Sequence, residues 1–93
     1  MSSLPLSGTC VAGWEHVHDA VLTNFAAGEE VGCSVAVYHK GQLVVDLVAG
    51  WADRGKTKEY AADALQLVFS TTKGVTATAV AMCVERGLLS YSQ

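Results

Sequence analysis

Proline and charged side chains are both scarce in this 93-residue chain. There is one proline, and Asp, Glu, Lys and Arg together make up 16% of the residues, below the usual share of about a quarter. A hydrophobic share of 51% supplies enough apolar area to drive collapse, which argues against disorder. The six Lys and Arg residues are scattered and the net charge is −3, so no nucleic-acid partner is expected. The length and composition of the chain indicate one small folded domain at most.

The chain also lacks metal-type cysteine spacing, a long apolar run and a leader-like start. Three cysteines, Cys10, Cys33 and Cys83, cannot all pair, so reduced thiols in a cytoplasmic protein are expected. The apolar run from Val75 to Val84 is too short to span a bilayer. The first 13 residues have neither a charged n-region nor a sustained hydrophobic region, which argues against a secretory signal.

Two segments before residue 50 carry clear periodicity. One helical face gathers the residues Trp14, Val17, His18, Val21, Leu22 and Phe25, and Gly28 follows as a stop. This predicts an amphipathic helix over about 13–27. Two valine-rich runs, 33–38 and 43–49, are joined by 39–42, which contains a glycine. They predict an antiparallel hairpin over about 33–49.

A second helix is predicted over about 71–86, with Ser70 as its N-cap and Gly87 just past its end. No charged residue lies between Lys73 and Glu85, and a helix that is apolar all round is normally buried all round. Ninety-three residues cannot wrap such a helix. The elements predict an α/β (α+β) fold, with 1–93 as a single partial domain.

The spacing of Ser70 and Lys73 carries the chemistry. Residues i and i+3 share one face of a helix, so the serine hydroxyl and the lysine amine can approach each other. A serine needs a nearby base, and apolar surroundings together with the positive end of the helix dipole favour a neutral amine. The helix start also offers the Ser70 backbone N–H to an oxyanion. The structural alternative is an N-cap serine beside a solvated lysine, and the four residues from Ser70 to Lys73, taken alone, favour that alternative.

Other candidate sites are weaker. His16 and His18 lie two apart, roughly 200° around a helix, so they cannot readily share a metal ion. A triad of Ser70 with His39 and either Asp46 or Asp53 has no support from spacing. We therefore expect no metal and no cofactor.

The order of motifs resembles the start of the beta-lactamase-related serine hydrolases: class C beta-lactamases, penicillin-binding DD-peptidases and family VIII carboxylesterases. The motifs that carry the resemblance are Ser-Val-Ala-Val-Tyr (34–38), Gly-Gln-Leu-Val (41–44), Gly-Trp-Ala-Asp (50–53), Phe-Ser-Thr-Thr-Lys-Gly (69–74) and Glu-Arg-Gly-Leu-Leu (85–89). They extend over nearly the whole chain, so the chain is identified as the N-terminal portion of such a fold.

The resemblance implies that Ser70 is acylated by an ester, amide or lactam carbonyl and that Lys73 helps to move the proton. It also implies a downstream Tyr-x-Asn tyrosine and a later strand that supplies a second oxyanion donor. Neither stands in this sequence, since Tyr38, Tyr60 and Tyr91 are not followed by asparagine two residues on. We therefore expect a truncated hydrolase that is inactive alone, with small esters favoured slightly over lactams or peptides.

The alternative is a non-catalytic short product that folds or acts only by association with a partner chain. An exposed hairpin edge and an unburied helix leave self-association open.

Overall fold

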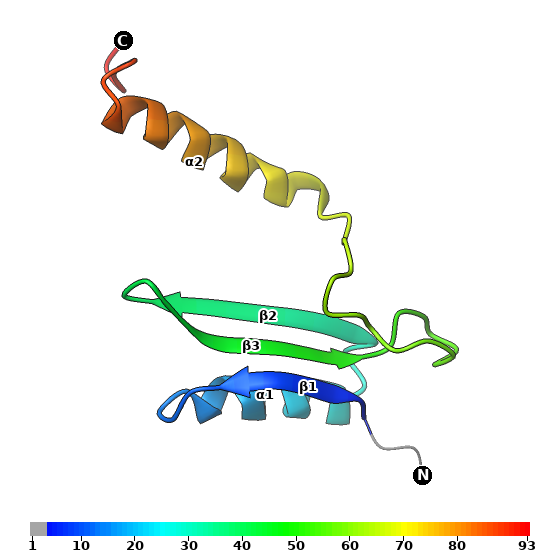
Figure 1. Ribbon diagram of the computed structural model, residues 1–93. Coiled ribbons are helices and arrows are strands. Elements are labelled where there is room, and N and C mark those ends of the chain that lie inside the picture. The colour runs from blue at the N-terminus through cyan, green and yellow to red at the C-terminus, as the bar shows by residue number, and fades with distance from the viewer. Residues whose placement is uncertain (1–3) are drawn as a thin grey trace.

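The computed structural model describes residues 4–93. Within them, three strands and two helices follow in the order β1 (Leu6–Cys10), α1 (Glu15–Ala26), β2 (Gly32–His39), β3 (Gln42–Gly50) and α2 (Thr72–Glu85), with a short 3-10 turn, η1 (Phe69–Thr71), directly before α2. The strands form one antiparallel sheet in the order β1-β3-β2 (Figure 1). Both helices lie within the ranges expected from the sequence, and the hairpin is one residue longer at each end than the predicted 33–49.

The hairpin turn is tighter than the four-residue link suggested by the sequence. His39 pairs with Gln42, so the loop consists of Lys40 and Gly41 alone, both with positive φ, 52° and 78°. Two positive φ values in a two-residue loop match the right-handed twist of the strands. The predicted hairpin is correct, but its turn is half as long as expected.

An irregularity in the hairpin register affects which side chains are buried. Val37 pairs with Val45 and Tyr38 with Leu43, so Val44 is an extra residue in β3. Such a bulge bends the strand and interrupts the alternation of inward and outward side chains. As a result, Val44 and Val45 are both buried although they are neighbours in sequence.

The core lies between β3 and α1, on one face of the sheet (Figure 1). Its fully buried side chain is Val45, in the central strand, and α1 contributes Val21. Half-buried side chains from all three strands and from α1 complete it, namely Leu6, Cys10, Trp14, Val17, Phe25, Cys33, Val35 and Val37. Each fully buried aliphatic side chain stabilises the fold by about 1.5–3 kcal/mol, so this small cluster accounts for the packing of α1 on the sheet.

Strand β1 was not predicted from the sequence. Its residues read Leu-Ser-Gly-Thr-Cys, and only the two ends, Leu6 and Cys10, are partly buried. The strand forms because it pairs along β3, from Leu6 opposite Ala49 to Cys10 opposite Val45. Pairing with a strand forty residues away leaves no periodic signal in five residues of local sequence.

Both helices end in the same way. After α1, the Gly28 N–H donates to Phe25 O and the Glu29 N–H to Asn24 O. After α2, Gly87 and Leu88 make the equivalent bonds to Val84 O and Cys83 O. This is the Schellman arrangement, which requires a left-handed residue at the position of each glycine, and it confirms both glycines as the predicted stops.

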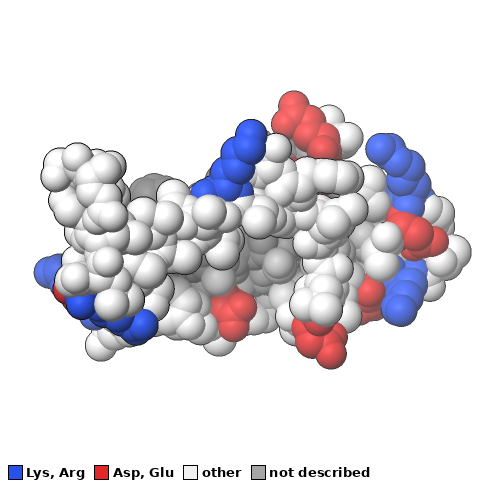
Figure 2. Space-filling model, turned by 90° about the horizontal axis from the view of Figure 1, so that it is seen from above, with Lys and Arg blue, Asp and Glu red and all other residues white. Residues whose placement is uncertain are grey.

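Helix α2 stands away from the sheet (Figure 1). None of its residues is buried, and Val75 is 67% exposed. The face seen in Figure 2 is largely uncharged, with basic and acidic residues scattered over it. The radius of gyration is 17.2 Å, against about 12 Å for a compact domain of this length. The burial expected for this helix is therefore absent within residues 4–93, because there only its own leading turn η1 contacts it to any extent.

The described residues contain no helix that is both long and apolar enough to cross a membrane.

Candidate active site

Ser70 lies in the middle of η1, the 3-10 turn that leads into α2. The turn is closed by a hydrogen bond from the Thr71 N–H to Val68 O, at 3.1 Å. The N-cap of α2 is Thr71 rather than Ser70, and its side chain makes no capping bond. The predicted capping role of Ser70 is thus wrong. Its side chain is exposed and is not engaged with the backbone of the helix start.

The residue before the serine has an unusual backbone. Phe69 adopts φ = 47°, in the left-handed region, and its side chain is 77% exposed. For a bulky residue that is not glycine, this conformation costs of the order of 1–3 kcal/mol. Strain of this kind collects at functional sites. The strained peptide here fixes the direction from which the chain enters the turn that carries Ser70.

Lys73 lies in the first turn of α2, three residues after Ser70. Residues i and i+3 eclipse in 3-10 geometry and share a face in α geometry, so both side chains project from the same side of this junction. Within α2, side-chain hydrogen bonds run from Thr76 Oγ1 to Thr72 O and from Thr78 Oγ1 to Gly74 O. Neither bond involves Ser70 or Lys73, which leaves both groups open to solvent and to a ligand.

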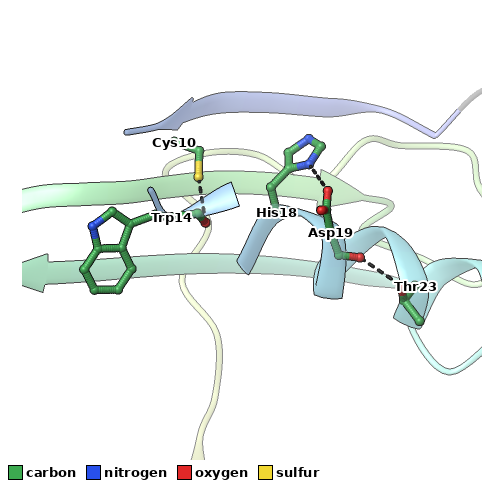
Figure 3. A network of polar contacts seen from close by, with 5 residues as sticks. All are labelled: Cys10, Trp14, His18, Asp19 and Thr23. Carbon is green, nitrogen blue, oxygen red and sulfur yellow. Dashed lines mark hydrogen bonds and ion pairs between the residues drawn. The ribbon is translucent and has the colours of Figure 1, made fainter. Parts of the chain in front are cut away.

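Three polar side chains in and near α1 have structural partners. The Cys10 thiol donates to Trp14 O at 3.1 Å, His18 Nδ1 lies 3.3 Å from Asp19 Oδ1, and Thr23 Oγ1 donates to Asp19 O (Figure 3). These contacts tie the start of α1 to β1 and to its own next turn. Among residues 4–93, no group of three His, Cys, Asp or Glu residues could hold a metal ion.

The alternative triad gains no support from the geometry. The His39 ring packs on Trp14, with centroids 5.5 Å apart, at the hairpin turn. The Asp53 carboxylate accepts hydrogen bonds from the Thr57 N–H and hydroxyl and from the Lys58 N–H. That carboxylate therefore holds its own loop together instead of facing an imidazole.

The three tyrosines are placed no better for proton transfer. The Tyr60 hydroxyl donates to Gln66 Oε1 at 3.3 Å, while Tyr38 and Tyr91 are exposed by 68% and 72%. The candidate site within the described residues is thus limited to Ser70 and Lys73, with the left-handed Phe69 directly before them. Ser70 and Lys73 remain predictions from the sequence, whereas nothing in the sequence indicated the left-handed backbone of Phe69.

The comparison with known proteins covers the same region. A family model described as Beta-lactamase matches residues 18–93, most of the chain. The chain belongs to the beta-lactamase family. This membership confirms the resemblance found in the motifs, and the matched region includes both Ser70 and Lys73.

This beta-lactamase-family chain is similar in sequence or in structure to three further proteins. It is 48% identical over 60 residues to the esterase/beta-lactamase LipL of Mycobacterium tuberculosis (strain ATCC 25618 / H37Rv), covering 64% of this chain and 14% of LipL. A family VIII carboxylesterase structure superposes with a TM-score of 0.87 at 39% identity, over 94% of this chain and 24% of that one. A penicillin-binding protein homologue from Caulobacter crescentus gives 0.84 at 38% identity, over 96% and 24%.

These superpositions confirm the α/β fold class of the beta-lactamase type. The chain spans about a quarter or less of the length of each relative.

Proposed function

We propose that this chain carries the nucleophile segment of a serine hydrolase, with Ser70 as nucleophile and Lys73 as its base partner. The observation that supports it best is the exposed pair at the η1–α2 junction, preceded by the strained Phe69, inside a region that matches the beta-lactamase family. An unstrained helix start with a capping serine would have favoured the structural alternative.

The reaction is acyl transfer to water through an acyl-enzyme. The Lys73 amine nitrogen accepts the Ser70 hydroxyl proton while Ser70 Oγ attacks the carbonyl carbon. The Ser70 backbone N–H at the start of the helix supplies one donor to the developing oxyanion. The C–O bond to the leaving alcohol breaks, and the alkoxide takes the proton. Water then attacks the acyl-Ser70 carbonyl, its proton returns to Oγ, and the acid leaves.

A carboxylic ester is the substrate class that the relatives favour. LipL is named an esterase/beta-lactamase and one structural neighbour is a family VIII carboxylesterase. The penicillin-binding protein homologue leaves a lactam or peptide carbonyl as the second choice. All three carbonyls would react at the same serine oxygen, and none of these reactions requires a metal.

A serine-directed fluorophosphonate tests the nucleophile. The experiment uses the longest natural polypeptide that contains this sequence. Trypsin releases residues 59–73, which contain Ser70 and end at Lys73. We expect the adduct on Ser70, its loss in Ser70→Ala, and labelling slowed by about 10²–10⁴ in Lys73→Met, the range for a lost general base. Thr72→Ala is the matched control and should label normally. An adduct that persists in Ser70→Ala would refute the assignment.

The 93-residue chain is further proposed to be inactive alone. Its Ser70 is exposed and α2 packs on nothing within residues 4–93, so water is not excluded from the reacting groups. Removing one oxyanion donor alone costs about 3 kcal/mol in other serine hydrolases. The chain should hydrolyse p-nitrophenyl acetate no faster than its Ser70→Ala variant. Turnover that disappears in this variant would contradict the proposal.

The second candidate is a chain that acts by association, with itself or with a partner. It is favoured by the outer edge of β2, which is unpaired in the sheet order β1-β3-β2, and by the exposed apolar α2. A cytoplasmic location is proposed with either function, because all three cysteines are free thiols. Cell fractionation checks the location, and recovery in the secreted fraction would exclude it.

A further inference from the structure

A hollow of about 600 Å³ lies beside the C-terminal end of α1, on the part of the molecule that is built from residues 4–56. Its volume falls within the range of about 300–1,000 Å³ that is usual for small-molecule sites. Apolar side chains from α1, from the segment before β2 and from the end of β3 form its lining, principally Leu22, Phe25, Val31 and Trp51. Neither Ser70 nor Lys73 is among the lining residues.

Two cationic side chains, Arg54 and Lys56, also line the hollow. Glu30 is on its lining as well, so the charges at the hollow sum to +1. An apolar wall with an excess of positive charge complements a ligand that has an aliphatic part and one negative charge. Arginine in particular suits a carboxylate, because its planar guanidinium can donate two parallel hydrogen bonds to it.

Hydrogen bonds to the Asp53 carboxylate and between backbone groups brace the loop that carries both cations. The Asp53 carboxylate accepts from the Thr57 and Lys58 N–H groups at 2.9 and 3.3 Å, and the Lys56 N–H donates to Asp53 O at 3.1 Å. The loop is anchored where the Ala52 N–H donates to Lys58 O and the Trp51 N–H to Val31 O. Arg54 and Lys56 are therefore presented to the hollow by a preorganised turn, which lowers the entropic cost of binding.

We propose that this hollow binds an amphipathic monoanion, a carboxylate on an aliphatic chain, with the carboxylate at Arg54 and Lys56 and the chain against Phe25 and Trp51. The site is separate from the Ser70–Lys73 pair, and the proposal does not depend on the chain being a hydrolase.

Trp51 provides the signal for a direct test. The other tryptophan, Trp14, packs on His39 at the hairpin turn, whereas Trp51 follows the opposite end of β3. In a Trp14→Phe background, decanoate below its micelle concentration should change Trp51 emission saturably, with one site per chain. Decyltrimethylammonium has the same chain with the opposite charge, so it should bind much more weakly.

Charge variants then test the cations. Arg54→Gln/Lys56→Gln should weaken decanoate binding by about tenfold, the value of two exposed ion pairs. The control Lys58→Gln/Arg86→Gln has the same loss of charge at side chains that do not line the hollow, and it should bind like the parent. Glu30→Gln should tighten binding about two- to fivefold. This gain cannot result from misfolding.

Three results would overturn the proposal. The first is a Trp51 emission that does not respond to decanoate. This result would favour the alternative that polypeptide, and not a small molecule, fills the hollow. The second is an equal response to decyltrimethylammonium, since that would show adsorption without charge recognition. The third is equal weakening in the two double variants.

Discussion

Gly50 shows how a single residue is constrained by its place in the fold. It ends β3 with φ = 83°, and a Cβ there would meet Val31 O and the Phe25 ring. Gly41, in the hairpin turn, has nearly the same backbone angle, 78°, but open space around it. Comparing an alanine substitution at each glycine therefore separates the cost of a left-handed backbone from the cost of a steric clash.

We predict that Gly41→Ala costs about 1 kcal/mol in free energy of unfolding, the strain of a left-handed alanine. Gly50→Ala should cost at least about 1–3 kcal/mol more, because the backbone of Val31 and the packed ring of Phe25 must also move. Urea denaturation of the two variants beside the parent measures the difference. Equal costs would mean that the Val31 segment yields without resistance.

Residue-scale features differ in how far the sequence predicts them. Gly28 and Gly87 follow amphipathic or apolar helical runs, and this position alone indicates a helix stop. Phe69 carries no such mark, because a left-handed backbone is disfavoured for a bulky residue and no sequence pattern announces it. The sequence therefore indicated Ser70 and Lys73 as candidates but gave no sign of the left-handed backbone of Phe69 beside them.

At the scale of one element, the loop after β3 depends on a single carboxylate. Hydrogen bonds from the Thr57 hydroxyl, the Thr57 N–H and the Lys58 N–H hold the pKa of Asp53 below its usual value of 3.8. A pKa that is lowered in the folded state stabilises it above the unfolded pKa. That stabilisation is lost as the pH falls through the lowered folded value.

Melting temperatures between pH 7 and pH 2 should therefore fall less in Asp53→Ala than in the parent, because the variant has already lost this contribution. Asp63→Ala is the matched control, because Asp63 is an exposed aspartate ten residues farther along the chain. The melting temperature of this control should fall with pH as much as that of the parent. An Asp53→Ala profile parallel to that of the parent would show that the carboxylate adds nothing to stability.

The elements themselves were predicted to different degrees. α1 and the hairpin have strong local patterns, with a period near 3.6 in one and valine-rich runs in the other. Strand β1 has no such pattern and exists because β3 offers it a partner. The bulge at Val44 is likewise set by tertiary pairing, since the predicted runs give no reason to prefer an extra residue there.

At the scale of the whole molecule, the chain divides into a packed part and a separate helix. The sheet and α1 share the core around Val45, whereas α2 contacts only its own leading turn η1 to any extent. The absence of charge between Lys73 and Glu85 predicts a buried helix, whereas none of the residues of α2 is buried within residues 4–93. Where its partner surface lies is tertiary information that the helix sequence does not contain.

This division predicts two levels of protection in amide hydrogen exchange. The β3 amides, paired on both sides, should exchange slowest, and the α2 amides should exchange almost as fast as in a free peptide. A helix of 14 residues that packs on nothing is marginal in water, where roughly 12–15 residues are needed even for good helix formers. Mass spectrometry of the 93-residue chain at micromolar concentration gives the comparison. If α2 were protected as strongly as β3 at every concentration, the result would contradict the structure. If the protection of α2 instead grew with concentration, and light scattering showed a rising mass, copies of the chain would be covering the helix for one another.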